Sequence, residues 1–206
     1  MRSCALLLGL AACSTPDRSD PGPAQSTSNA PRDNRVSDSI VTSGRDTAPL
    51  RVEVDVAARQ VRVLAGANDT LAAHPVAVGS EEWPTRTGTW TIGQVVLNPE
   101  WIPPDETWAD EAESRQPGDP KNPLGRAQLV YDLPRSIHGT NNPASIGKAV
   151  SHGSIRVTNE VAIALARLLI ERTGAGDAAS LLAAAQRDSS VKNVLNLPMV
   201  VPIRVF

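Results

Sequence analysis

The chain has 206 residues, of which 41% are hydrophobic, enough to bury one compact core with extensions. Its 20 basic and 22 acidic residues leave a net charge of −2, so no long-range field draws it to nucleic acid, and no nucleic-acid partner is expected. The three histidines and the scattered carboxylates show no metal-ligand spacing, so neither a metal nor a cofactor is expected.

The N-terminus has the features of a secretory signal. One arginine precedes an apolar run over residues 5–12, which is far shorter than the roughly 20 residues of a membrane-spanning helix. Leu10-Ala11-Ala12-Cys13 resembles the bacterial lipobox, whose cysteine is lipidated and becomes the new N-terminus. We therefore expect residues 1–13 to be a lipoprotein-type signal peptide with lipidation at Cys13, and an ordinary cleaved signal is the alternative. Ser14 favours sorting to the outer membrane over the inner one.

Residues 14–48 predict a disordered tether. They are rich in Ser, Pro, Asp, Asn and Arg and hold almost no large apolar residue, so they cannot bury enough surface to fold. A flexible coil of about 35 residues has a mean reach of roughly 30–35 Å. We expect the folded part to hang clear of an envelope membrane, on its periplasmic face, and to touch that membrane only through the lipid. Because Cys4 lies in the signal and Cys13 is either lipidated or lost with it, the mature chain has no thiol for a disulfide, a nucleophile or a metal ligand.

Residues 49–206 are expected to form one mainly β domain. Apolar and polar residues alternate in LRVEVDV (50–56) and again in QVRVLA (60–65), which predicts a β-hairpin. Further strand-like pieces follow, separated by turns rich in Pro and Gly: HPVAVG (74–79), GTWTIG (88–93) and AQLVYDL (127–133).

Residues 98–125 predict a long irregular loop, because they carry many prolines and a cluster of acids. A loop of this length is either a lid or binding wall, or a solvated insertion. Trp101 and Trp108 lie within it and could line a groove, whereas Trp90 alternates with threonines and is expected in the core.

Residues 158–174 give the clearest helical pattern. Thr158 is a plausible N-cap and Gly174 a stop, and one face is apolar (Val161, Leu165, Leu168 and Leu169). An Ala-rich second helix is predicted over 177–186, and MVVPIRVF (199–206) is predicted to be a strand.

Two of the three histidines, His138 and His152, stand in near-identical phrases, HGT and HGS, and Ser154 completes the second. A serine becomes a nucleophile only when a base takes its proton and donors meet the developing oxyanion. Either histidine could be that base, and Gly139 and Gly153 allow tight turns that bring N–H groups close to a substrate. The alternative is that Ser154 is an ordinary turn serine and the histidines are packing or capping residues.

The stretch from His138 to Arg156 resembles the signature of the YkuD-type L,D-transpeptidases, which cross-link bacterial peptidoglycan. That signature is a histidine, a spacer, then Ser/Thr-His-Gly-Cys, an apolar residue and Arg or Asn; here the second part reads SHGSIR. VAVGSEEWPTRTGTWTI, NPEWIPP, KNPLGRAQLVYDLPRSIHGTNNPASIGKAV and VPIRVF also resemble family segments in family order. The resemblance covers residues 49–206 and implies a β-sandwich with one or two flanking α-helices.

The resemblance also implies roles for the residues of the motif. His138 takes the position of the general base, Gly139 that of the residue whose carbonyl orients it, and His152 that of the second motif histidine. The N–H groups of Gly153 and Ser154 would form the oxyanion hole.

Four further residues are expected to contact a peptidoglycan stem peptide: Arg156, Ser151, Trp101 and Asn141.

The sequence departs from the family at the nucleophile, where Ser154 replaces the cysteine. A hydroxyl depends on the base far more than a thiol does. One reading is an acyl transferase that acts on tetrapeptide stems through an acyl-enzyme, with possible carboxypeptidase activity. The alternative is a catalytically silent, peptidoglycan-binding lipoprotein.

Overall fold

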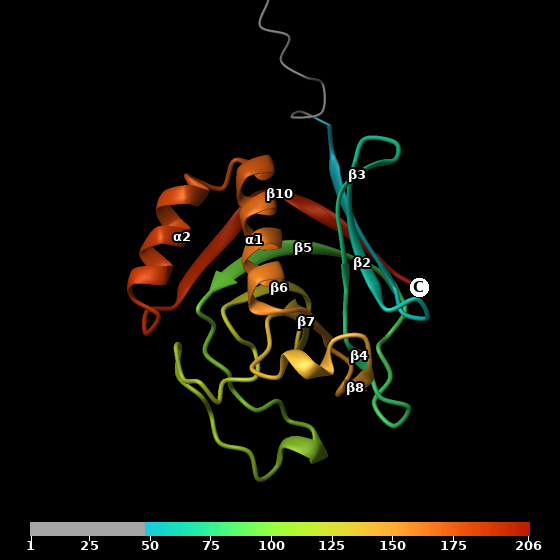
Figure 1. Ribbon diagram of the computed structural model, residues 1–206, viewed down its shortest axis with the longest axis vertical. Coiled ribbons are helices and arrows are strands. Elements are labelled where there is room, and N and C mark those ends of the chain that lie inside the picture. Colours follow the sequence, from blue (N-terminus) through green and yellow to red (C-terminus); the bar gives the residue numbers. More distant parts are fainter. Residues whose placement is uncertain (1–47) are drawn as a thin grey trace, which may run out of the picture. The chain divides into compact units, whose positions relative to one another are not determined.

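The computed structural model describes residues 48–206, so the predicted signal peptide, Cys13 and all but the end of the tether lie outside the described residues. The described chain is mainly β, with a curled eight-stranded sheet of order β3-β2-β1-β10-β5-β6-β7-β9 and a two-stranded sheet of β4 and β8 (Figure 1). The strands are β1 (Leu50–Asp55), β2 (Gln60–Ala65), β3 (Asp69–Pro75), β4 (Val78–Gly79), β5 (Gly88–Leu97), β6 (Ala127–Asp132), β7 (Arg135–His138), β8 (Ala149–Ser151), β9 (Ile155–Arg156) and β10 (Asn193–Val205). The helices are α1 (Asn159–Thr173) and α2 (Ala178–Arg187).

The predicted hairpin of β1 and β2 is confirmed, with Val52 opposite Val63 and Val54 opposite Val61, all buried. The last strand, β10, lies in the middle of the sheet. It runs parallel to β1, with Val52 beside Ile203, and antiparallel to β5. The two halves of the sheet are therefore joined by pairing between β1 and β10, the first and last strands of the described chain.

Several strands differ from their predicted bounds, and β5 runs on to Leu97. The piece predicted over residues 74–79 is divided between the end of β3 and β4, and β3 begins already at Asp69. β3 is an edge strand with no buried residue, so it lacks the strong apolar alternation that marks the hairpin. β10 begins at Asn193, before the predicted start, and its first four residues pair with the end of β5. β7, β8 and β9 were not predicted.

Both helices are confirmed; α1 has the predicted cap and stop, and α2 is shifted by one residue from its predicted range. The Thr158 hydroxyl accepts a hydrogen bond from the Val161 N–H at 3.3 Å, and Gly174 ends α1 in the left-handed conformation at φ 72°. The buried face of α1 runs through Ala162, Leu165 and Leu169, and the helix covers one face of the curled sheet (Figure 1). Neither helix within residues 48–206 is long and apolar enough to span a membrane.

Residues 98–125, called the wall loop below, are irregular as predicted, apart from a 3₁₀ turn at Thr107–Ala109. Two buried asparagines fix its ends. The Asn98 amide donates to the Ala185 carbonyl in α2 at 2.8 Å. The Asn122 amide donates to the Pro99 carbonyl at 2.8 Å, so the loop is also closed on itself. The loop is thus an ordered part of the domain and can form a defined surface.

Candidate active site

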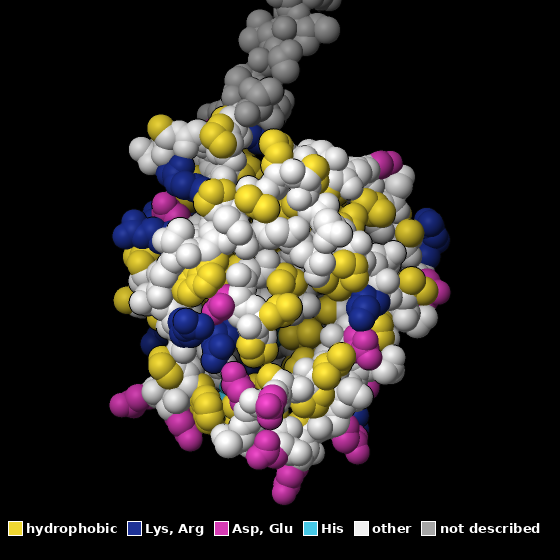
Figure 2. Space-filling model, turned by 180° about the vertical axis from the view of Figure 1, so that it is seen from behind, with side chains coloured by type: hydrophobic (Ala, Val, Ile, Leu, Met, Phe, Trp, Pro, Cys, Tyr) yellow, Lys and Arg dark blue, Asp and Glu magenta, His cyan; other side chains and the backbone are white. Residues whose placement is uncertain are grey.

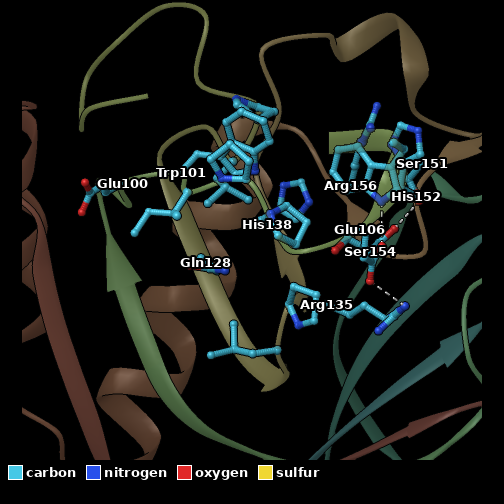
Figure 3. A pocket seen from close by; sticks show the side chains of 18 residues that line it. Glu100, Trp101, Glu106, Gln128, Arg135, His138, Ser151, His152, Ser154 and Arg156 are labelled. Carbon is cyan, nitrogen blue, oxygen red and sulfur yellow. Dashed lines mark hydrogen bonds and ion pairs between the residues drawn. The ribbon is translucent and has the colours of Figure 1, made fainter. Parts of the chain in front are cut away.

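A cavity of about 720 Å³ lies between the wall loop and the segment that joins β8 to β9. Figure 2 shows this face of the molecule hollowed, with hydrophobic side chains on the floor of the hollow. The wall loop supplies a largely apolar side of the cavity, which includes Trp101, Ile102, Pro103, Pro104, Trp108 and Leu124. The opposite side is polar and includes Arg135, His138, Ser151, His152, Ser154 and Arg156. In Figure 3, His138 lies between Trp101 on one side and the group formed by Ser151, His152, Ser154 and Arg156 on the other.

Ser154 sits in a bend between β8 and β9 and is half-buried. The Ser151 hydroxyl donates to the Ser154 carbonyl at 2.6 Å, which ties the two ends of the bend together. The Ser154 hydroxyl oxygen accepts the Ser136 N–H of β7 at 3.3 Å. One lone pair of the hydroxyl is thereby engaged by the protein, while its proton is free to be donated.

His138 ends β7 and is only 4% exposed. Its Nδ1 lies 2.6 Å from the carbonyl oxygen of Gly139. A carbonyl can only accept, so Nδ1 carries the proton and Nε2 keeps its lone pair. Burial lowers the pKa of His138 from 6.5 to about 4; the Gly139 carbonyl opposes that shift, and the positive charge of Arg156 adds to it. His138 is therefore neutral at neutral pH and can accept a proton at Nε2.

The two motif glycines are required by the close packing around the site. A side chain at Gly139 would overlap the Asn159 side chain at the start of α1. Gly153 has a φ of +92°, which L-residues rarely adopt, and a Cβ there would lie 3.2 Å from Nε of Arg135. Within the described part of the chain, neither the Gly153 N–H nor the Ser154 N–H is donated to a protein acceptor. Two donors beside Ser154 are thus available to a ligand oxygen.

His152 is held by aromatic rings. Its ring stacks on Trp108, with centroids 4.0 Å apart and planes 5° apart, and meets the edge of Trp83 at 6.0 Å. The Trp108 indole N–H donates to Glu106 at 2.6 Å, and Glu106 pairs with Arg135 at 3.2 Å. This chain of contacts connects the wall loop to β7 and to the bend that carries Ser154.

The charges around His152 act in opposite directions. Burial is the largest influence and lowers its pKa, and Arg156 lowers it further. The carboxylates of Glu106 and Glu82 raise it. His152 therefore also favours its neutral form.

The structure brings together most of the residues that the sequence nominated. Six of them line the one cavity, namely Trp101, His138, Ser151, His152, Ser154 and Arg156. Trp108 lines it as well, as expected, whereas Trp90 packs against Tyr131 with ring centroids 5.6 Å apart. Asn141 is exposed and is not among the lining residues. No cluster of three or more His, Cys, Asp or Glu side chains within residues 48–206 is placed to hold a metal ion.

Sequence reasoning missed Glu106 and Arg135, which hold Trp108 against the site. Glu106 belongs to a run of acids that reads equally well as solvated surface. Arg135 begins a short strand that was not predicted. Nothing in the sequence around Glu106 or Arg135 indicates that these two residues pair with each other.

Comparisons with known proteins agree with this geometry. The family model for the YkuD L,D-transpeptidase catalytic domain matches residues 49–178. The chain is 35% identical over 124 residues to the "Putative L,D-transpeptidase YkuD" of Bacillus subtilis, covering 60% of this chain and 62% of that protein. It is 30% identical over 122 residues to the "Probable L,D-transpeptidase ErfK/SrfK" of Escherichia coli K12, covering 56% and 39%.

The match thus spans less than two thirds of the length of either relative. The solved structure of the Ldtfm-avibactam carbamoyl enzyme shares the fold, with a TM-score of 0.50 at 13% identity over 76% of this chain and 48% of that one. From the family-model match, the chain belongs to the YkuD family of L,D-transpeptidase catalytic domains.

Proposed function

We propose that this protein is a peptidoglycan-modifying acyl transferase in which Ser154 replaces the cysteine nucleophile of the family. Its substrate would be a tetrapeptide stem, cut at the L-to-D peptide bond before the terminal D-amino acid. The acyl group would then pass to an amine, which gives a cross-link, or to water, which gives carboxypeptidase activity.

The observation that carries the proposal is the placement of Ser154 and His138 in one cavity. The ring of His138 is fixed through Nδ1 by the Gly139 carbonyl, so its basic Nε2 is the nitrogen left for the cavity. A serine needs such a base, because its hydroxyl is not ionised at neutral pH.

The proposed reaction has four proton and bond changes. Nε2 of His138 takes the Ser154 proton as the oxygen attacks the carbonyl carbon. The oxyanion accepts hydrogen bonds from the free N–H groups of Gly153 and Ser154. The C–N bond then breaks, and His138 returns the proton to the leaving amine. An acceptor amine or water releases the acyl group by the reverse proton path.

We further propose the setting of this chemistry. Residues 1–13 would be removed as a lipoprotein signal, Cys13 would carry the lipid, and residues 14–48 would tether the domain of residues 49–206 at the periplasmic face, with the outer membrane favoured by Ser14. Mass spectrometry of the N-terminal peptide, and of a Cys13→Ala variant, tests the lipid directly.

The test of the chemistry is intact-mass spectrometry of the purified protein and of its Ser154→Ala and Ser154→Cys variants. Each is incubated with a tetrapeptide stem and, separately, with avibactam, because a protein of the same fold is solved as its carbamoyl enzyme. We expect an adduct on the wild type and on Ser154→Cys, and none on Ser154→Ala.

If only the Ser154→Cys variant forms an adduct, the site is assembled but the natural serine does not act as a nucleophile. The silent stem-peptide binder would then be the better account. Adduct formation on Ser154→Ala would exclude Ser154 as the nucleophile altogether.

A further inference from the structure

A second, smaller cavity of about 230 Å³ adjoins the catalytic one. It is lined by Asn142, Ala144, Ser145, Lys148, Val150 and Arg156. Arg156 is the one described residue that lines both cavities. A ligand with its reacting bond at Ser154 can therefore extend past Arg156 into the second cavity.

The second cavity is basic. Two of its lining residues, Lys148 and Arg156, carry positive charge, and none is acidic. Within residues 48–206 neither cationic group has an ion-pair or hydrogen-bond partner. The other arginine that lines the catalytic cavity, Arg135, is paired with Glu106. An unpaired guanidinium that is half-buried has lost part of its hydration and favours an anionic partner.

The backbone of Arg156 is held in place on both sides. The Arg156 N–H donates to the Ala77 carbonyl at 2.9 Å, and the Ala77 N–H donates to the Arg156 carbonyl at 2.8 Å. On the other side, β9 pairs with β7, with Arg156 beside His138. The side chain is thus presented from a backbone that is held on both sides, so binding a ligand costs only side-chain freedom and no ordering of the main chain.

The backbone of Lys148 is also hydrogen-bonded on both sides. Its N–H donates to the Ser145 carbonyl at 3.1 Å, and its carbonyl accepts from the Val78 N–H at 3.0 Å. The side chain is exposed, so it adds a second positive charge at the mouth of the cavity.

We propose that the second cavity binds a carboxylate of the substrate, with the planar guanidinium of Arg156 as its main partner and Lys148 as a second cation. The identity of that substrate as a stem peptide rests on the proposed function. Two kinds of carboxylate occur in such a stem, the C-terminal one and those on internal residues, and the experiment below separates them.

A bound carboxylate also alters the base. Burial lowers the pKa of His138 most, and the positive charge of Arg156 lowers it further, while the Gly139 carbonyl raises it. Arg156 lowers the pKa of His152 too, against Glu106 and Glu82. A carboxylate on Arg156 offsets its charge, so binding raises the pKa of both histidines and makes His138 a stronger base when the substrate is in place.

The test is calorimetric binding to the full chain with Ser154→Ala, in which no turnover can occur. The probes are a tetrapeptide stem with free carboxylates, the same stem amidated at its C-terminus, and the same stem amidated on its internal carboxylates. We expect one of the two amidations to weaken binding about 10- to 100-fold, as for loss of a charge-assisted hydrogen bond.

That loss should disappear when Arg156→Met is added, and should shrink with Lys148→Ala. Arg156→Lys, which keeps the charge without the planar fork, gives an intermediate loss and covers the case in which Arg156→Met does not fold. Lys121→Ala is the control, since Lys121 is an exposed lysine that lines neither cavity.

The proposal is overturned if both amidated stems bind as tightly as the free stem, if the losses are unchanged in the Arg156 and Lys148 variants, or if no stem binds. Because binding is measured without turnover, a carboxylate dependence without acylation of the wild type would reject only the acyl-transfer proposal. Acylation with no carboxylate dependence would reject only this one.

Discussion

Burial of His138 should make the stability of the domain depend on pH in a defined window. Its pKa is about 4 in the folded chain, against 6.5 when exposed. Between these values the unfolded chain binds a proton that the folded chain does not, so stability falls as pH falls from 6.5 towards 4. From the two pKa values, this one group removes about 2 kcal/mol between pH 7.5 and pH 5.

The substitution that isolates this effect is His138→Gln, which cannot take up a proton. Urea unfolding of the full chain and of the variant is measured at pH 7.5 and at pH 5. We expect the wild type to lose about 2 kcal/mol more than the variant between the two pH values. Any constant effect of the substitution on packing cancels in this difference.

The matched control is His74→Gln, which removes the half-exposed histidine of β3, outside the cavity. Equal pH losses in the wild type and in His138→Gln would refute the buried, neutral state assigned to His138. It would also remove the basis for His138 as a base that stays unprotonated in mildly acidic conditions.

Three further predictions concern the surroundings of the site. Asn98→Ala removes the side-chain hydrogen bonds by which buried Asn98, at a φ of 49°, holds the wall loop. It should lower the free energy of unfolding by about 2–4 kcal/mol in urea titrations. Gly153→Ala should cost about 1–2 kcal/mol from its φ of +92°, seen in thermal unfolding, and should reduce adduct yield by moving a donor of the oxyanion. Trp108→Phe keeps a ring on His152 but loses the bond to Glu106, so it should weaken stem binding by about 1 kcal/mol, and Trp108→Ala should weaken it more; equal effects would show that stacking contributes nothing.

The sequence predicted best what depends on neighbouring residues. The alternation of β1 and β2, the Thr158 cap and the Gly174 stop are local patterns, and each appears in the structure. β7 was missed because it has four residues and follows a proline turn, and four residues are too few for a period of two to stand out.

At the site, the sequence predicted the participants but not their arrangement. The motif nominated Ser154 and His138, yet residues 152–154 form a bend, so strand alternation cannot say which way the side chains point. Only the structure shows Trp108 lying flat on His152 and Arg156 between two cavities. Such contacts join segments far apart in the chain, and a single sequence carries no record of them.

The central position of β10 has a consequence for how this domain is made. β1 and β5 both pair with β10. Ile203 of β10 lies between Val52 of β1 on one side and Trp90 of β5 on the other. Until β10 has emerged from the ribosome, the β1–β2 hairpin and the paired strands β5, β6 and β7 form two separate sheets, each with an unpaired edge. The complete sheet should therefore form only after residues 193–205 have emerged, and a nascent chain stalled short of residue 193 should be sensitive to protease along its whole described length.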